Sequence, residues 1–247
     1  VAVLLASLTW GWFRLFASDY ALLGKHVAAG AGFVANLVLW SEAGYFDAAS
    51  DTKPLLHLWS LGIEEQFYLL WPALVYLTWM RRWPVIAVMA GVLAVSFSIN
   101  VVQVRTDEVS AFYSPLTRLW ELAMGGGLAY VVLRHGQGRD TLRVATYWWS
   151  PRADTLRDLA SVAGLSCVLI AVWGYSAGTS FPGWRAGLPT LGALLLIAAG
   201  PDAVINPRLL SLRWVVLIGL ISYPLYLWHW PLLAFATLAG ETTASLR

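Results

Sequence analysis

Long apolar stretches separated by short polar ones run along the whole chain, and their lengths are typical of helices that cross a membrane. A spanning helix needs about 20 apolar residues, and we count roughly eight candidates. They fall near residues 1–17, 25–41, 57–80, 83–104, 115–134, 159–177, 187–200 and 213–239. The second and seventh are short, so tilted, kinked or re-entrant helices are predicted there. The pattern predicts an all-α fold, a polytopic transmembrane bundle of about 8 helices.

Prolines and chain ends complete this picture. Pro224 and Pro231 fall inside the last stretch and predict kinks, because proline lacks the N–H of a helical hydrogen bond. No soluble domain and no internal repeat is visible, so we expect a single transmembrane domain over residues 1–247.

Val1 opens directly into an apolar run without Met or a basic leader segment. We therefore expect the chain to be truncated at its N-terminus and also at its C-terminus.

Composition supports a membrane protein and excludes a nucleic-acid partner. Hydrophobic residues make up 59% of the chain and charged residues only 12%, whereas a soluble domain carries about 25% charged residues. Fifteen Trp are present, and indoles favour the boundary between water and lipid. The net charge of +2 is too small to indicate nucleic-acid binding. The expected partner is the lipid bilayer.

Charges in the loops predict an orientation. The 41–53 loop is net acidic, whereas the Arg81–Arg82 turn and the long polar segment 134–158 are rich in arginine. Under the positive-inside rule the two arginine-bearing loops face the cytoplasm. The acidic loop then faces out.

The first candidate site lies in the run HLWSLGIEEQFYLLWP, residues 57–72. On a helix, His57, Ser60, Glu64 and Tyr68 project within roughly 80° of one another, and Glu65 lies about 100° from Glu64. An ionisable side chain in a membrane helix is costly unless it is paired or wetted, so it marks a functional site by default. The alternative is a helix end in the interfacial zone with solvated acids.

A second candidate lies in LISYPLYLWHWPLL, residues 220–233. There Ser222, Tyr226 and His229 fall within roughly 60° on a helical projection. These side chains either line a site or anchor the helix at the membrane boundary, where Trp228 and Trp230 also favour anchoring.

A third candidate lies in SPLTRLWELAMGGGLAY, residues 114–130. Arg118 and Glu121 are three positions apart and can pair on one face. Such a pair is either functional or a structural ion pair near the boundary. His26 beside Lys25 indicates a helix end whose polar side chains reach water. No metal-ligand spacing and no phosphate-binding glycine loop is present, so neither a metal nor a permanently bound cofactor is expected.

These segments resemble one protein family. The stretch DYALLGKHVAAGAGFVANLVLWSEAGYFDAASDTKPLLHLWSLGIEEQFYLLWP is similar to the acyltransferase family 3 membrane proteins, and the other two segments follow in the same order. These bacterial inner-membrane, multi-pass enzymes O-acylate surface polysaccharides such as lipopolysaccharide, peptidoglycan or exopolysaccharide. The resemblance implies about ten core helices and an acyl-CoA donor, usually acetyl-CoA, reached from the cytoplasm. It also implies a surface glycan or lipid-linked glycan acceptor on the outer side.

Residue by residue, the resemblance places the family's Ser-x-x-x-Glu motif on Ser60 and Glu64 and its Arg-x-x-Glu motif on Arg118 and Glu121. Glu64 then orients or charges the family's principal catalytic His, which we expect to be missing from this chain, or relays its proton, and Ser60 is its hydrogen-bond partner. The expected catalytic residues are Glu64, Ser60 and His57. Arg118 binds a CoA phosphate or holds Glu121. The other expected binding residues are Glu65, Tyr68, Tyr226 and His229.

The chain also departs from the family pattern. No Arg or Lys is followed by ten residues and a His, the arrangement that carries the family's catalytic His. We therefore expect that the first two helices and any C-terminal esterase-like domain are missing and that the fragment is inactive. Counting from the family's N-terminus also places Val1 near the cytoplasm, whereas the loop charges place it outside.

The intact protein is expected to transfer an acyl group to a polysaccharide hydroxyl. The competing class is a transporter or flippase, in which the same polar stripes line a path without covalent chemistry. A third possibility is a non-catalytic membrane partner.

Overall fold

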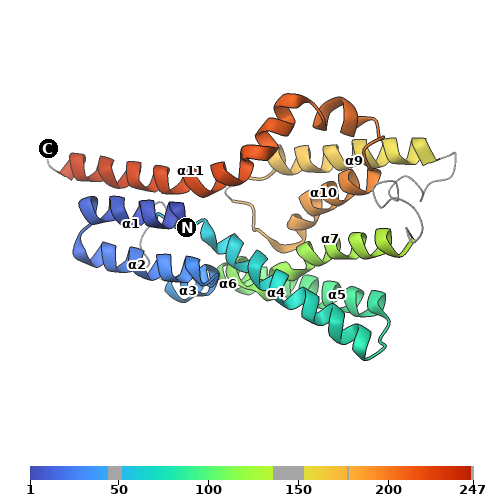
Figure 1. Cartoon of the computed structure of the whole chain (residues 1–247), viewed down its shortest axis with the longest axis horizontal. Helices are drawn as coiled ribbons and strands as arrows, with labels where there is room; N and C mark the ends of the chain where they lie inside the picture. Colours follow the sequence, from blue (N-terminus) through green and yellow to red (C-terminus); the bar gives the residue numbers. More distant parts are fainter. Residues whose placement is uncertain (44–51, 136–152, 177, 246–247) are drawn as a thin grey trace. The chain divides into compact units, whose positions relative to one another are not determined.

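The computed structural model of the 247-residue chain describes residues 1–43, 52–135, 153–176 and 178–245, and every regular element in these ranges is a helix (Figure 1). The predicted all-α class is confirmed. The longer helices are α1 (Ala2–Arg14), α2 (Ala17–Ala31), α3 (Ala35–Glu42), α4 (Leu58–Met80), α5 (Val85–Thr106), α7 (Pro115–His135), α9 (Ala153–Gly174), α10 (Gly187–Ala199) and α11 (Arg213–Ser245). Short helical turns are α6 (Glu108–Tyr113), η3 (Gly183–Ala186) and η4 (Asn206–Leu210).

Three helices of the described ranges are long and apolar enough to cross a membrane, namely Val85–Thr106, Asp154–Gly174 and Arg213–Gly240. The predicted count of about eight spanning helices stays a prediction. Helices α4 and α7 have 23 and 21 residues, but each carries charged residues within its apolar sequence. The predicted charged loops fall mainly on residues 44–51 and 136–152, which lie outside the described residues.

The stretch 25–41, where a tilted, kinked or re-entrant helix was predicted, is divided between two helices, because the chain breaks between α2 and α3. Gly32 ends α2, and Phe33 adopts a φ of 56° in the left-handed region. A non-glycine residue at this φ is strained. Gln66 of α4 donates to the Phe33 carbonyl at 3.0 Å, so a contact from a distant helix stabilises the break.

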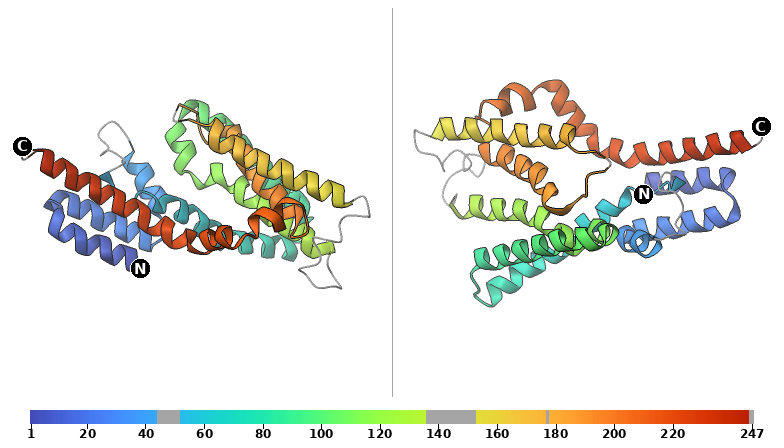
Figure 2. Two further views of the ribbon diagram at one scale, coloured as in Figure 1. Left: turned by 90° about the horizontal axis from the view of Figure 1, so that it is seen from above. Right: turned by 180° about the vertical axis from the view of Figure 1, so that it is seen from behind.

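The chain divides into two compact units, which are described separately. Unit 1 comprises residues 1–72, 113–115 and 219–247, and unit 2 comprises residues 73–112 and 116–218. In unit 1 the C-terminal part of α11 lies beside α1 (Figures 1 and 2). The core of this unit consists of buried apolar residues with α11 side chains packed against them: Val3, Leu23, Ala35, Leu55, Leu58, Leu227 and Phe235.

An amide pair ties α3 to α4 in unit 1. Gln66 donates to the Asn36 side chain at 2.9 Å, and Asn36, fully buried, donates to the Tyr113 carbonyl at 3.2 Å. Gly62 makes this approach possible, because a Cβ there would lie 2.7 Å from the Asn36 amide oxygen. Buried amides need such partners. The pair therefore holds the first two turns of α4, which carry Ser60 and Glu64, against α3.

In unit 2, α9 and α10 lie side by side (Figure 1) and touch through two glycines. A Cβ added to Gly164 would lie 2.8 Å from the Gly192 carbonyl oxygen, and one added to Gly192 would lie 2.8 Å from the Gly164 carbonyl oxygen. Small residues permit such close backbone approach between membrane helices.

Gly164→Ala is therefore expected to destabilise unit 2 by about 1–3 kcal/mol, the usual range for overpacking. The measurement is the thermal midpoint of the protein in detergent. Gly91→Ala on α5 is the matched control, because a Cβ there would meet nothing within 4 Å and alanine favours a helix. An equal midpoint for Gly164→Ala and wild type would contradict the close contact.

Candidate functional site

A hydrogen-bonded chain in unit 1 joins the start of α4 to α11. The Tyr226 hydroxyl lies 2.7 Å from Ser60 Oγ and donates a short hydrogen bond to the His57 carbonyl oxygen. A phenol has a single proton to donate. Because the carbonyl takes that proton, Ser60 is the donor to Tyr226. Ser60 thus donates to Tyr226, and Tyr226 donates to the His57 backbone carbonyl.

A second contact from α11 holds the same segment. Trp230 donates its indole N–H to the Lys53 carbonyl at 2.9 Å. Tyr226 and Trp230 are four positions apart on one face of α11. Tyr226 binds the carbonyl of His57 and Trp230 binds that of Lys53, and these two carbonyls are also four positions apart. Residues 53–57, directly before α4, are therefore fastened to α11 at both ends. These two bonds fix the backbone that carries the His57 side chain.

The imidazole rings of His57 and His229 lie close together beside the two hydrogen bonds from α11. The His57 ring centroid lies 5.8 Å from that of His229 and 5.3 Å from that of Tyr226. His229 Nδ1 lies 2.8 Å from the Tyr226 carbonyl, so this nitrogen carries a proton, and Nε2 is the nitrogen that can accept one.

His57 differs from His229 because its side chain is buried, with 6% of its surface exposed. Neither of its ring nitrogens makes a hydrogen bond of standard geometry with the part of the chain that the structure describes. The ring is within electrostatic reach of the Leu227 backbone and of His229. Pro231 cannot donate to the Leu227 carbonyl, its helical partner position. A buried polar group of this kind needs an explanation, and a role toward a ligand is one.

Glu64 lies one turn beyond Ser60, and its carboxylate is close enough to act on the Tyr226 hydroxyl electrostatically. Glu65 acts on Glu64 in the same way, and both side chains are half-buried. Tyr68 is 58% exposed. The polar residues that the sequence placed on one face of this helix therefore differ in exposure. His57, Ser60 and Glu64 are buried or half-buried, whereas Tyr68 is exposed.

The predicted pairing of Arg118 with Glu121 is confirmed in unit 2. The Arg118 guanidinium lies 3.0 Å from a Glu121 carboxylate oxygen, and both side chains are largely buried. The guanidinium also lies over the rings of Phe112 and Phe181, 5.9 and 5.4 Å from their centroids. Ion pairing and contact with aromatic faces both stabilise a cation away from water. Arg118 therefore holds Glu121, and its expected role toward a CoA phosphate stays a prediction.

Sequence reasoning missed an ion cluster around Glu42 in unit 1. Lys25 and His26 contact its two carboxylate oxygens at 2.7 and 2.8 Å, and Lys53 lies 3.5 Å away. His26 and Lys53 are buried. The interpretation of Lys25 and His26 as a helix end reaching water is therefore wrong for His26, because α3 brings Glu42 onto its ring.

The Glu42 cluster predicts a pH dependence of stability. Burial alone raises the pKa of the Glu42 carboxyl, but the hydrogen bonds from Lys25 and His26 outweigh burial and leave the pKa below its ordinary value. A lowered pKa in the folded state stabilises the fold above the unfolded pKa, and this contribution is lost as the pH falls through the folded pKa. We expect the thermal midpoint to fall more steeply between about pH 5 and 3 in wild type than in Glu42→Gln.

The control for this experiment is Asp154→Asn. The Asp154 side chain is 86% exposed and its contact with Arg157 is a loose 3.7 Å, so the variant is expected to keep the wild-type pH profile. Parallel profiles for wild type and Glu42→Gln would contradict the assigned role of the cluster.

Among the described residues, no three or more His, Cys, Asp or Glu side chains gather as metal ligands do. The candidate site in unit 1 is instead made of proton-exchanging groups: two imidazoles, a carboxylate and two hydroxyls. The sequence segments containing these groups were predicted, but not that Trp230 and Lys53 help to place them. The repeat of Tyr226 and Trp230 at a spacing of four was the available signal.

The helices and this cluster define a helical membrane protein in which a buried imidazole, that of His57, lies beside a set of titratable and hydroxyl side chains. The family model described as an acyltransferase domain, acyltransferase 3, matches residues 2–243. The chain belongs to this family. The match runs through both compact units.

Curated relatives are distant but similar over most of the chain. A "putative membrane-bound transacylase BcsY" of Komagataeibacter xylinus is 28% identical over 94% of this chain and 54% of the relative. A "peptidoglycan O-acetyltransferase OatA" of Listeria monocytogenes is 28% identical over 83% of this chain and 33% of the relative. An "O-acetyltransferase OatA" of Staphylococcus aureus is 28% identical over 74% of this chain and 30% of the relative. The chain thus spans about half the length of BcsY and about a third of the OatA proteins. No solved structure matches.

Proposed function

We propose that the protein is a membrane O-acyltransferase of the bacterial inner membrane that transfers an acyl group, acetyl in the first instance, from acyl-CoA to a hydroxyl of a cell-surface polysaccharide. Two findings support the class of reaction: the match of the family over nearly the whole chain, and relatives named for O-acetyl transfer. The structural observation that carries the proposal is the buried His57 ring, which lies beside the rings of Tyr226 and His229, with Glu64 within electrostatic reach of the Tyr226 hydroxyl.

The reaction requires one proton transfer and one bond exchange. The acceptor hydroxyl loses its proton to a base as its oxygen forms an ester bond with the acyl carbon, and the carbon–sulfur bond of the thioester breaks. The proton then passes to the CoA thiolate. A side chain that takes the hydroxyl proton must lie within hydrogen-bond reach of it. Carboxylate and imidazole side chains perform this step most often.

In this proposal Glu64 accepts the hydroxyl proton or relays it, and Ser60 and Tyr226 position the helix turn that carries Glu64. His57 is the second proton-binding group, and the accepting nitrogen of His229 lies beside it. Arg118 and Glu121 form the family's second motif, and we propose that they bind substrate as a pair. Glu65 and Tyr68 are the remaining candidates for contact with substrate.

Radiolabelled acetyl-CoA tests the reaction in membrane vesicles from cells that express the gene product containing this chain. The expected result is covalent label on a polysaccharide, which mild base releases as acetate because the linkage is an ester. If polysaccharide crosses the vesicle membrane but carries no label, the protein is instead a transporter. The control is the same vesicles from cells without the gene.

A further inference from the structure

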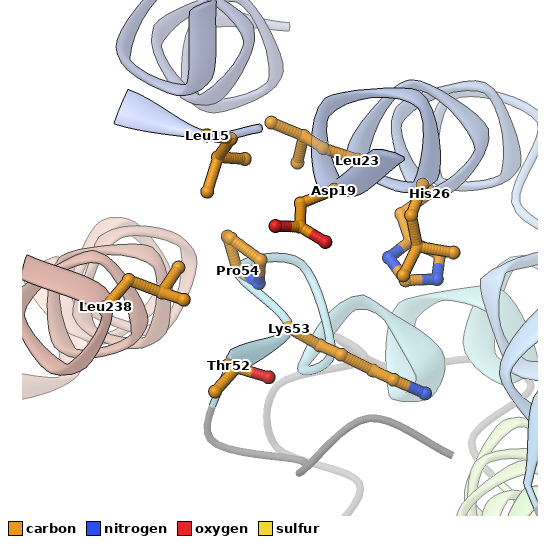
Figure 3. A pocket seen from close by; sticks show the side chains of 9 residues that line it. Leu15, Asp19, Leu23, His26, Thr52, Lys53, Pro54 and Leu238 are labelled. Atoms are coloured by element: carbon orange, nitrogen blue, oxygen red, sulfur yellow. The ribbon is translucent and has the colours of Figure 1, made fainter. Parts of the chain in front are cut away.

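A pocket of about 210 Å³ in unit 1 is distinct from the proposed acyl-transfer cluster (Figure 3). Its lining comes from the turn between α1 and α2, from α2, from the segment before α4 and from α11: Leu15, Asp19, Leu22, Leu23, His26, Thr52, Lys53, Pro54 and Leu238. The volume is below the range of about 300–1,000 Å³ typical of pockets for drug-sized ligands. A single small head group therefore fits, whereas a whole CoA molecule does not.

The walls of the pocket differ in character. Leu15 and Leu238 lie on one side in Figure 3, and His26 lies on the other, with the Lys53 side chain running toward it. Asp19 and Thr52 add a carboxylate and a hydroxyl. A cavity with apolar side chains on one side and charged groups on the other is complementary to an amphiphile, a molecule with a polar head and an apolar tail.

The charged wall is built into the fold. The side chains of His26 and Lys53 are only 4% and 3% exposed, and both contact Glu42. This contact holds the imidazole and the ammonium in place before a ligand arrives, and such preorganisation favours binding. Lysine is a well-established phosphate binder because its compact charge attracts phosphate oxygens. Asp19, by contrast, is exposed and can accept hydrogen bonds from hydroxyl groups.

We propose that this pocket binds the head group of a phosphate-bearing amphiphile. The phosphate lies beside Lys53 and His26, hydroxyl groups of the same head donate to Asp19, and the apolar tail follows Leu15 and Leu238. The membrane contains two sources of this chemistry, a bulk phospholipid and a lipid-linked sugar phosphate. The proposal concerns binding and does not depend on acyl transfer.

Binding is measured by native mass spectrometry and by thermal shift on the full chain in a neutral detergent. The probes are dihexanoylphosphatidylglycerol, farnesyl phosphate, inorganic phosphate and the uncharged dihexanoylglycerol. Both tailed phosphates are expected to bind more tightly than either inorganic phosphate or dihexanoylglycerol. Tighter binding of farnesyl phosphate supports a lipid-linked carrier, and tighter binding of phosphatidylglycerol supports a bulk phospholipid.

Variants of opposite sign make the test independent of folding defects. Lys53→Gln is expected to weaken both tailed phosphates by about tenfold or more, because a charge-assisted hydrogen bond is lost. Asp19→Asn is expected to strengthen them by a few fold, because it removes a like charge from the pocket. Lys25→Gln is the matched control, since Lys25 also contacts Glu42 but does not line the pocket.

Three results would overturn the proposal. One is equal affinity of wild type, Lys53→Gln and Asp19→Asn for the tailed phosphates. Another is binding of dihexanoylglycerol as tight as that of dihexanoylphosphatidylglycerol, which would show that the phosphate contributes nothing. The third concerns Leu238→Asn, which is expected to weaken binding of farnesyl phosphate and to leave binding of inorganic phosphate unchanged. Equal weakening of both ligands would show that the tail does not contact Leu238.

Discussion

Glu64→Gln is expected to lower acyl transfer by about 10² to 10⁴-fold, the usual contribution of a positioned general acid or base. Glutamine keeps the size of the side chain and its place one turn beyond Ser60, but its amide cannot take the proton of the acceptor hydroxyl. The measurement is the initial rate of label transfer from radiolabelled acetyl-CoA to polysaccharide in vesicles, divided by the amount of protein in the membrane.

Two further variants sharpen this experiment. Glu64→Asp keeps the carboxylate on a shorter stem, so it is expected to retain more activity than Glu64→Gln. Asp202→Asn is the control for general loss of acidic charge, because Asp202 lies exposed in a turn of unit 2, and its rate is expected to equal that of wild type. A wild-type rate in Glu64→Gln would show that Glu64 has no part in the chemistry.

Tyr226→Phe is expected to lower acyl transfer by about ten- to a hundredfold. The phenol is the acceptor for Ser60 and the donor to the His57 carbonyl, and its loss leaves both groups without that partner. Leaving a part-buried group unsatisfied costs about 1–3 kcal/mol, and each 1.36 kcal/mol corresponds to a tenfold change in rate. The same labelled-transfer assay measures the effect.

Tyr223→Phe is the matched control for this variant. Tyr223 lies one turn earlier on α11 and is 58% exposed, so removal of its hydroxyl is expected to leave the rate unchanged. Because Ser60 and Tyr226 act through one shared bond, Ser60→Ala combined with Tyr226→Phe should cost less than the sum of the two single changes. Strict additivity of the two effects would show that the bond between them is not what supports activity.

Local sequence was sufficient to predict most helices. The predicted helices over 57–80 and 83–104 correspond closely to α4 and α5, since apolar length and flanking prolines are properties of contiguous residues. The pairing of Arg118 with Glu121 was predicted for the same reason, because three positions on one helix fix which side chains meet.

The short length of the 25–41 stretch indicated an irregular helix, but the position of the break between α2 and α3 could not be predicted from local sequence. Its left-handed residue, Phe33, accepts a hydrogen bond from Gln66, more than thirty positions further along the chain. The burial of His26 likewise depends on Glu42. The turn from α2 into α3 brings the Glu42 carboxylate into contact with the His26 ring. Local propensity contains no information about such partners.

The sequence by itself determined that this chain is an α-helical membrane protein and which segments carry ionisable groups, because hydropathy and helical spacing act over neighbouring residues. Only the tertiary structure decided which of these groups meet. Ser60 and Tyr226 are 166 positions apart, and Trp230 fastens the residues before α4 from the same distant helix. Contacts of this range arise from packing of whole helices, so no local pattern could have assigned His57 its neighbours.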